Sequence, residues 1–293
     1  MFLVLLLLFS QNLTYSRGQN ISPAYEGWEK AADGTRYFVF GYMNRNWEEE
    51  IDVPIGPDNG FNLGGNDQGQ PTHFLPRRNR FMFKVRVPDK FAEKDELVWT
   101  LTVRGKTEKA YASLRPDYII DDVVKASETG ALGAGTSSPE VRANKAPSVR
   151  VDLTKTRTIK VGQPLALISE TEDDGVPRRR IAGAAAVVLA ARAATTPPVR
   201  ITVGKNLGLH VSWFVYRGAG KVAFDPPQVK VWEDTRAGAN SPWAPIWIAD
   251  PMPADGRITA TVTFDRPGTY VLRCRADDGA LFSDQEITIV VTP

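Results

Sequence analysis

Short segments in which apolar and polar residues alternate recur along the whole chain and predict a protein built from β-strands. Successive side chains of a strand point to opposite faces of its sheet, so a period of two marks a half-buried strand. In the segment 80–87 (RFMFKVRV), the apolar face is expected to comprise Phe81, Phe83, Val85 and Val87. Further strands are expected at 36–44, 51–55, 96–103 and 109–114, whereas 20–34 is interpreted as a short lead-in.

The second half of the chain shows the same periodicity in longer segments. In HVSWFVYR, one face holds Val211, Trp213 and Val215, and the opposite face holds His210, Ser212, Phe214 and Tyr216. Residues 257–293 contain three alternating segments joined by Pro-Gly and Asp-Asp-Gly turns. The 21 prolines and 24 glycines punctuate short apolar runs in both halves. The sequence therefore predicts an all-β protein.

A change of composition divides the chain into two domains. Residues 121–147 are small, polar and interrupted by Gly and Pro, which is typical of a flexible linker. We expect a β-sandwich at 19–120 and a second one at 148–293. An Ala-rich insertion at 176–198 interrupts the second; its apolar stretch spans eleven residues, too few to cross a membrane. A low-complexity loop and a short Ala-rich helix are its two interpretations.

The first residues predict export. Residues 2–9 form an unbroken apolar run of the length of a signal-peptide core, although a basic flank is missing. We expect a signal peptide at 1–18 and a periplasmic, cell-surface or extracellular location; the alternative is a buried N-terminal strand. No cysteine follows the run, which argues against a lipid anchor. Cys274 is the single cysteine, so no internal disulfide is expected, and its place in a strand indicates a buried structural thiol.

The last strands resemble those of a bacterial immunoglobulin-like domain of the PKD or cadherin-like kind. The resemblance rests on PGTYVLRCRADDGALFSDQEITIVV, with Tyr270 where such sandwiches place an inward tyrosine near the start of the penultimate strand. It covers most of 148–293 and implies two tandem immunoglobulin-like sandwiches. It implies little about function.

The first domain resembles a small β-module that recurs in secreted bacterial multidomain proteins. The matching segments are FGYMNRN at 40–46, VPIGPDNGF at 53–61, DQGQPTHFLPRR at 67–78 and LVWTLTVRGKTEKAYA at 98–112. The resemblance implies an appended structural or binding unit without a catalytic role. The run Glu48–Glu50 is not part of that pattern and is interpreted as a solvated strand edge.

Calcium is the one metal that the sequence suggests, because calcium binds carboxylate and carbonyl oxygens on loops. Two acidic loops would lie at one pole of an immunoglobulin-like sandwich. The candidate ligands are Glu172, Asp173, Asp174, Asp277 and Asp278. A weaker candidate loop holds Asp58, Asn59, Asn62, Asn66 and Asp67. The alternative is that Asp-Asp-Gly is only a preferred turn sequence.

Tryptophans in a Pro-rich segment are candidates for ligand contact. Exposed indoles on a sandwich loop can stack on sugar rings or dock a partner, although many fold back onto a sheet edge. The candidates are Trp232, Trp243 and Trp247, whereas Trp28, Trp99 and Trp213 are predicted core residues.

Nothing in the sequence marks an enzyme. Motifs of zinc proteases, serine hydrolases, P-loops and dinucleotide sites are absent, and His73 and His210 lie far apart in the chain. The formal net charge of +2 does not suggest nucleic acid as a partner. We therefore expect an exported structural or interaction protein that binds envelope or extracellular proteins or copies of itself. A carbohydrate-binding accessory protein is the alternative, and a hydrolase with a hidden site is the third.

Overall fold

The computed structural model describes residues 15–128, 139–151, 156–177, 208–232 and 251–293. Its first sandwich is made of β1 (Ile21–Lys30), β2 (Arg36–Asn44), β3 (Ile51–Asp52), β4 (Asn59–Phe61), β5 (His73–Phe74), β6 (Arg77–Arg86), β7 (Leu97–Val103) and β8 (Lys106–Ala112). The sheets have the orders β1-β2-β6 and β4-β7-β8, with β3 paired to β5. The all-β prediction is confirmed for the described residues.

Alternate residues of β2 contribute to the core of the first sandwich. Phe38, Phe40 and Tyr42 of β2 are fully buried in one cluster that also contains Trp99 of β7. Ten of the 23 buried residues in this cluster are aromatic, and the ring of Phe83 stands edge-on to that of Trp99 with centroids 5.0 Å apart. Such pairs add stabilisation beyond the area they bury.

Two sequence expectations in the first sandwich are wrong because of β-bulges. Residues 21–30 form the strand β1 and not a lead-in; its register shifts between Tyr25 and Gly27, which breaks the period of two. In β6 the register with β2 is irregular, and Phe81 has φ 53°. Phe81 therefore packs with Val39 in a separate cluster. Met82, which the alternation places on the face opposite Phe81 and Phe83, is 2 % exposed and lies in the main core.

The second sandwich has the strand order of a constant-type immunoglobulin domain. Its strands are β9 (Ser148–Val151), β10 (Thr156–Lys160), β11 (Leu165–Glu172), β12 (His210–Arg217), β13 (Val222–Asp225), β14 (Arg257–Phe264), β15 (Gly268–Asp277) and β16 (Phe282–Thr292). One sheet runs β13-β14-β11-β9 and the other β10-β16-β15-β12. In chain order these are the D-E-B-A and G-F-C sheets, with β10 added parallel to β16.

Tyr270 confirms the predicted tyrosine near the start of the penultimate strand. Its ring is fully buried, and its hydroxyl donates to the carbonyl oxygens of Ala219 and Arg266 at 2.8 and 3.0 Å. This is the tyrosine corner of immunoglobulin-like sandwiches. Trp213 and Cys274, which are partners in the β12–β15 register, complete the core beside it.

The described parts of the segment between the sandwiches contact the second one. They contain the 3₁₀ turn η1 (Pro116–Tyr118) and the helices α1 (Asp122–Glu128) and α2 (Pro139–Arg142). Ala126 packs on Ala280 and Leu281, and the Asn144 amide donates to Asp278 Oδ2 at 3.0 Å. Within the described residues, no helix has the length and apolar character needed to span a membrane. Nearly all of the Ala-rich insertion lies outside those residues.

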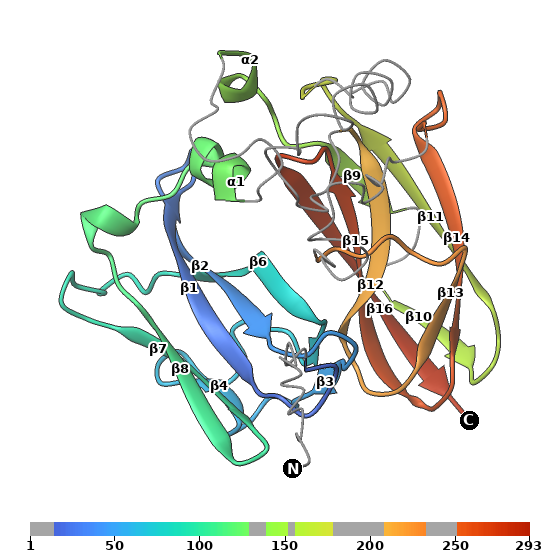
Figure 1. Cartoon of the computed structure of the whole chain (residues 1–293), viewed down its shortest axis with the longest axis horizontal. Coiled ribbons are helices and arrows are strands. Elements are labelled where there is room, and N and C mark those ends of the chain that lie inside the picture. The colour runs from blue at the N-terminus through green and yellow to red at the C-terminus, as the bar shows by residue number, and fades with distance from the viewer. Residues whose placement is uncertain (1–14, 129–138, 152–155, 178–207, 233–250) are drawn as a thin grey trace, which may run out of the picture.

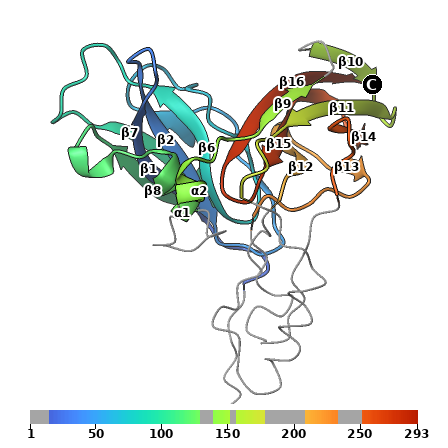
Figure 2. The ribbon, with the colours of Figure 1, turned by 90° about the horizontal axis from the view of Figure 1, so that it is seen from above.

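Figures 1 and 2 show the two sandwiches side by side, with β6 of the first next to the β12–β15–β16 face of the second. An atomic contact confirms this placement, because Arg273 of β15 donates a hydrogen bond to the carbonyl oxygen of Met82 on β6. The two sandwiches of the predicted tandem arrangement thus pack directly against each other.

Candidate functional site at the interdomain joint

The outer face of sheet β10-β16-β15-β12 is covered by the first sandwich. The side chains that β12 presents on this face are His210, Ser212, Phe214 and Tyr216, and each is at most 6 % exposed. Phe214 and Tyr216 belong to the same apolar cluster as Phe40 of the first sandwich. We call this contact, between residues 67–86 and strands β12, β15 and β16, the interdomain joint.

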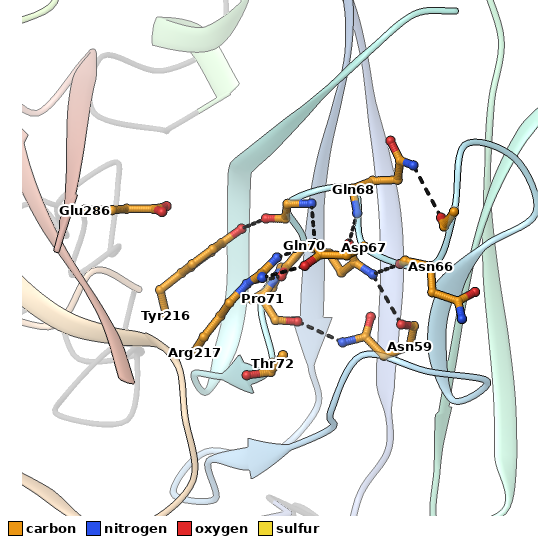
Figure 3. A network of polar contacts seen from close by, with 12 residues as sticks. Asn59, Asn66, Asp67, Gln68, Gln70, Pro71, Thr72, Tyr216, Arg217 and Glu286 are labelled. Atoms are coloured by element: carbon orange, nitrogen blue, oxygen red, sulfur yellow. Dashed lines mark hydrogen bonds and ion pairs between the residues drawn. The ribbon is translucent and has the colours of Figure 1, made fainter. Parts of the chain in front are cut away.

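A loop of the first sandwich, residues 67–72, is bonded directly to the end of β12 (Figure 3). The amide of Thr72 donates to the carbonyl oxygen of Tyr216 at 3.2 Å, and the amide of Gly218 donates to Thr72 Oγ1 at 3.2 Å. The hydroxyl of Tyr216 donates to the carbonyl oxygen of Gly69. These bonds continue the backbone pairing of β12 into the other domain.

Arg217 reinforces the same loop with its guanidinium group. Its Nη atoms lie 3.0 and 2.8 Å from the two carboxylate oxygens of Asp67, and its Nε donates to the Gln70 carbonyl oxygen at 2.9 Å. The guanidinium is the largest factor that lowers the pKa of the Asp67 carboxyl, which keeps the pair ionised. Bidentate pairing of this kind fixes orientation as well as distance.

Buried amide side chains hold the loop in shape from within the first sandwich. The Asn59 amide donates to the carbonyl oxygens of Val53 and Pro71 at 2.9 and 2.8 Å, and its Oδ1 accepts from the Trp99 indole at 3.0 Å. Gln70 in turn donates to the carbonyl oxygens of Asn59 and Asn66. Asn59 and Gln70 are fully buried.

Two arginines of β15 occupy the centre of the joint. Arg275 donates to both oxygens of Asp284 at 2.8 Å, and its guanidinium lies 3.6 Å from the ring centroid of Phe282. Arg273 pairs with Glu286, lies 3.5 Å from the ring centroid of Tyr216 and reaches Met82 as described. Burial of these arginines is tolerated because each planar guanidinium group stacks on an aromatic ring and binds a carboxylate at the same time.

The arginines set the charge state of Asp284. Burial opposes ionisation of this carboxyl, but the positive charges of Arg275 and Arg273 outweigh burial and hold its pKa below the ordinary value of 3.8. The carboxylate is therefore an acceptor and a counter-ion at neutral pH. It is not a proton donor.

His73 is the one histidine of the first sandwich, and two carboxylates hold it. His73 Nδ1 lies 2.7 Å from Asp52 Oδ1, and Nε2 lies 3.0 Å from Glu50 Oε2. Burial lowers its basicity, but the bonds to both carboxylates outweigh burial and raise its pKa to about 9. At neutral pH the ring is protonated and both N–H groups are engaged, so it has no lone pair for general-base chemistry.

The acidic run thus has a role that period counting missed. Glu50 and Asp52 are two residues apart and face the same side of the chain at β3, opposite His73 of β5. Glu49 pairs with Arg104 and accepts from the Gly18 amide at 2.7 Å. The solvated-edge interpretation holds for Glu48 and Glu50, whose side chains are exposed, and is wrong for half-buried Glu49. The E-x-D spacing places both carboxylates on one side of the strand, but His73 lies 21 residues beyond Asp52, so no local motif marked this pairing.

The structure does not gather the predicted calcium ligands into a metal centre. Asp277 and Asp278 are buried and accept turn amides, with Gly279 N at 2.7 Å from Asp277 and Ala280 N at 2.6 Å from Asp278. Across the residues that the structure describes, no group of three or more His, Cys, Asp or Glu side chains is arranged to hold a metal. Calcium binding stays a prediction.

The other acidic loop residues are accounted for locally. Asp174 accepts the amides of Lys145 and Val176 at 3.1 and 2.9 Å, and Asp173 accepts that of Gly175 at 3.0 Å. Glu172 is exposed and lies 3.6 Å from Arg150. These contacts are those of turns and a surface ion pair. In the weaker candidate loop, Asn59, Asn66 and Asp67 serve the interdomain joint instead.

Of the three candidate ligand-binding tryptophans, Trp232 is described and Trp243 and Trp247 lie outside the described residues. Trp232 is half-buried against the apolar cluster of the first sandwich and lines a pocket of about 170 Å³ beside the joint. Glu50 and His73 line the same pocket from the first domain. The predicted core positions of Trp99 and Trp213 are confirmed.

No protein-family model matches the sequence, and no curated protein matches it. Among solved structures, the chain is similar to a conjugative transposon lipoprotein from Bacteroides eggerthii, with 9 % identity over 49 % of this chain and 95 % of that one, at a TM-score of 0.28. Domains 4 and 5 of the S-layer protein SbsC match with 8 % identity, 94 % and 98 % coverage and a TM-score of 0.24.

The D00-D0 domain of intimin also matches, with 9 % identity over 92 % of this chain and all of that one, at a TM-score of 0.24. At scores this low the likenesses carry no argument about this chain. The immunoglobulin-like assignment rests on its own strand order and tyrosine corner.

Proposed function

We propose that this chain is an exported, non-catalytic structural or interaction protein of the bacterial envelope or cell surface, whose two sandwiches act as one rigid unit. One observation carries the proposal: the charged side chains that the fold brings together at the joint form ion pairs with one another. Asp67 holds Arg217, Asp284 holds Arg275, and two carboxylates hold His73. Charged groups that are paired in this way fix the positions of the two domains, and we infer that they do not act on a substrate.

The surfaces left for partners are sheet edges. Strands β8 and β13 each end a sheet, and Tyr111 on β8 has a side chain that is 53 % exposed. Exposed strand edges pair with strands of other chains, which supports contact with envelope proteins or with a second copy. The PKD-like and secreted-module resemblances fit this use of the fold.

The test is made in the native host with a tagged full-length chain. We expect the protein in the envelope or surface fraction, and we expect chemical cross-linking to capture an envelope protein or a second copy. Purified protein is examined in parallel by light scattering. A cytoplasmic, monodisperse monomer that cross-links to nothing would overturn the proposal.

Rigidity is tested separately by small-angle scattering. We expect the wild-type profile to fit a single packed pair of sandwiches. Arg217→Ala combined with Asp67→Ala is expected to increase the radius of gyration, because the bidentate pair is removed. Asp89→Ala, at an exposed pair with Arg86, is the matched control and should leave the profile unchanged.

A further inference from the structure

Residues 115–126, which we call the strap, leave the first sandwich along the edge of β1. The indole Nε1 of Trp28 donates to the Arg115 carbonyl oxygen at 2.9 Å, and the amide of Ile120 donates to the Trp28 carbonyl oxygen at 3.0 Å. Ile119 and Trp28 form a parallel β-bridge. The strap therefore covers part of a strand edge that would otherwise be open to pairing with another chain.

The edge of β1 is shaped to let the strap approach closely. Gly27 has φ 137°, and a Cβ atom at this position would lie 2.5 Å from the Tyr118 carbonyl oxygen and 2.6 Å from Ile120 Cγ2. Only glycine accepts both this backbone conformation and this proximity. The site on β1 therefore fits the strap, and the strap is the segment that is seen to fit it.

Apolar side chains of the strap contact both sandwiches. Ile120 is buried in one cluster with Val39 and Phe81 of the first sandwich, and Phe282 of the second packs against that cluster. Ala126 is buried against the turn between β15 and β16. The strap and the second sandwich are thus packed together, and both are packed on the first sandwich.

One ion pair fixes the position of the strap along β1. Lys125 Nζ lies 2.6 Å from Glu29 Oε2, and the side chains of the two residues are 19 % and 14 % exposed. Lys84 of β6 pairs with the other oxygen of Glu29. Burial opposes ionisation of Glu29, but its bonds to both lysines outweigh burial and lower its pKa. The strap therefore supplies a positive charge to a partly buried carboxylate of β1.

The strap begins at a short exposed hinge. Arg115, Pro116 and Asp117 are exposed, whereas Leu114 before them is buried in the first core. Arg115 has the extended backbone that a following proline favours. If this hinge opens, the first sandwich of a second copy offers the strap and the second sandwich the same contacts. Short hinges of this kind favour the exchange of elements between copies.

We propose that two copies of this chain exchange their straps together with their second sandwiches, so that each strap lies on β1 of the other copy. A second copy is the occupant that the contacts favour. It brings the aliphatic side chain for the cluster beside β1, the ammonium for Glu29 and the backbone that passes Gly27. This inference rests on the self-assembly branch of the proposed function.

The experiment reverses the charges of the Glu29–Lys125 contact in two separate full chains, Glu29→Lys and Lys125→Glu. In either variant alone, the strap meets a like charge in the monomer and in an exchanged dimer. In an exchanged dimer of the two variants, the native side chains meet at one contact and the reversed side chains at the other. The variants are unfolded together in guanidinium chloride with a reductant, refolded as a mixture and measured by size-exclusion chromatography with light scattering.

We expect the mixture to contain about tenfold more dimer than either variant refolded alone, because both like-charge contacts are replaced by opposite charges. The chain that carries both reversals should refold with the dimer content of the wild type. The matched control mixes Arg86→Glu with Asp89→Lys. This pair lies within the first sandwich, so exchange does not reunite it and the mixture should show no gain of dimer.

A mixture that refolds to monomers overturns the proposal, and so do dimers that form equally in each variant alone, because the contact would then not involve the strap. If either variant fails to refold alone, exchange should still rescue it in the mixture, and a mixture without folded dimer also overturns the proposal. Each of these failures leaves the envelope-partner branch of the proposed function in place, since cross-linking in the host tests that branch.

Discussion

Replacing Asp284 by Asn tests whether the buried arginines of the joint are held by charge. The side chain of Asp284 is 18 % exposed, and those of Arg275 and Arg273 are 4 % and 7 % exposed. Asparagine keeps the shape and one acceptor oxygen, but it removes the counter-ion of Arg275. Glu286 still pairs with Arg273. The variant therefore leaves one guanidinium buried without an opposite charge.

The size of the effect follows from that unpaired charge. Breaking a buried ion pair from one side costs about 3–5 kcal/mol, and the retained amide oxygen places this case near 3 kcal/mol. For a protein of this size, each kcal/mol shifts the melting temperature by about 2–4 °C. We therefore expect Asp284→Asn to lower the melting temperature by roughly 6–12 °C.

The measurement is thermal unfolding followed by circular dichroism and tryptophan fluorescence, with Asp89→Asn as the control. Asp89 also pairs with an arginine, Arg86, at 3.4 Å, but both side chains are largely exposed. The control should change the melting temperature by about 4 °C at most, because surface pairs contribute about 1 kcal/mol or less. Equal shifts in the two variants would refute the claim that the joint depends on this ion pair.

The pH dependence gives the same claim a second test. The pKa of Asp284 is lower in the folded protein than its ordinary value of 3.8. Its stabilising contribution is therefore complete above about pH 4 and is lost as pH falls through the folded pKa. The gap in melting temperature between wild type and Asp284→Asn should narrow in that acid range. A gap that does not change with pH would contradict the ionised state of Asp284.

Three further outcomes are expected. His73 has a pKa raised from 6.5 to about 9, so its stabilising contribution is complete below about pH 6.5 and is lost as pH rises through 9. The melting temperatures of the wild type and His73→Gln should therefore converge over that range. Two curves that stay parallel would refute the pairing. Arg217→Ala should speed hydrogen exchange at the Thr72 amide and not at amides of β7, and unchanged Thr72 exchange would show that the guanidinium does not hold the loop. Tyr270→Phe should lower the free energy of unfolding by about 1–2 kcal/mol, whereas Tyr111→Phe at an exposed position should leave it almost unchanged. Equal losses in the two variants would show that the tyrosine corner does not stabilise the fold.

The period of two was enough to predict most of the strands and their buried faces. Phe83, Val85 and Val87 lie on the predicted face, as do Trp213 and Tyr270 in the second sandwich. Alternation failed where a bulge adds a residue to one strand, as at Gly27 and Phe81. A bulge shifts the phase of side chains next to it; Gly27, a glycine inside a strand, is a local sign of one, whereas Phe81 gives no such sign.

The interdomain joint could not be predicted from the alternation of apolar and polar residues, because it pairs residues that lie half the chain or more apart. Asp67 and Arg217 are separated by 150 positions, and Met82 and Arg273 by 191. One signal was present on β12, whose supposed outer face carries Phe214 and Tyr216. Aromatic residues on both faces of a strand predict a layer on each side. The sequence could thus indicate that something covers this face, but not what covers it.

The loop at 67–72 shows why polar composition alone misplaces residues. The buried part of this loop, Gln70 and Pro71, has no strand partner for its backbone groups, and leaving those groups unpaired would destabilise the fold. Side-chain amides solve this problem: Asn59 bonds the carbonyl oxygens of Val53 and Pro71, and Gln70 bonds that of Asn59. These amides are therefore what allows Gln70 and Pro71 to be buried between the two domains, while Asp67 and Gly69 of the same loop stay exposed. Their chemistry, and not their exposure, is what the motif specifies.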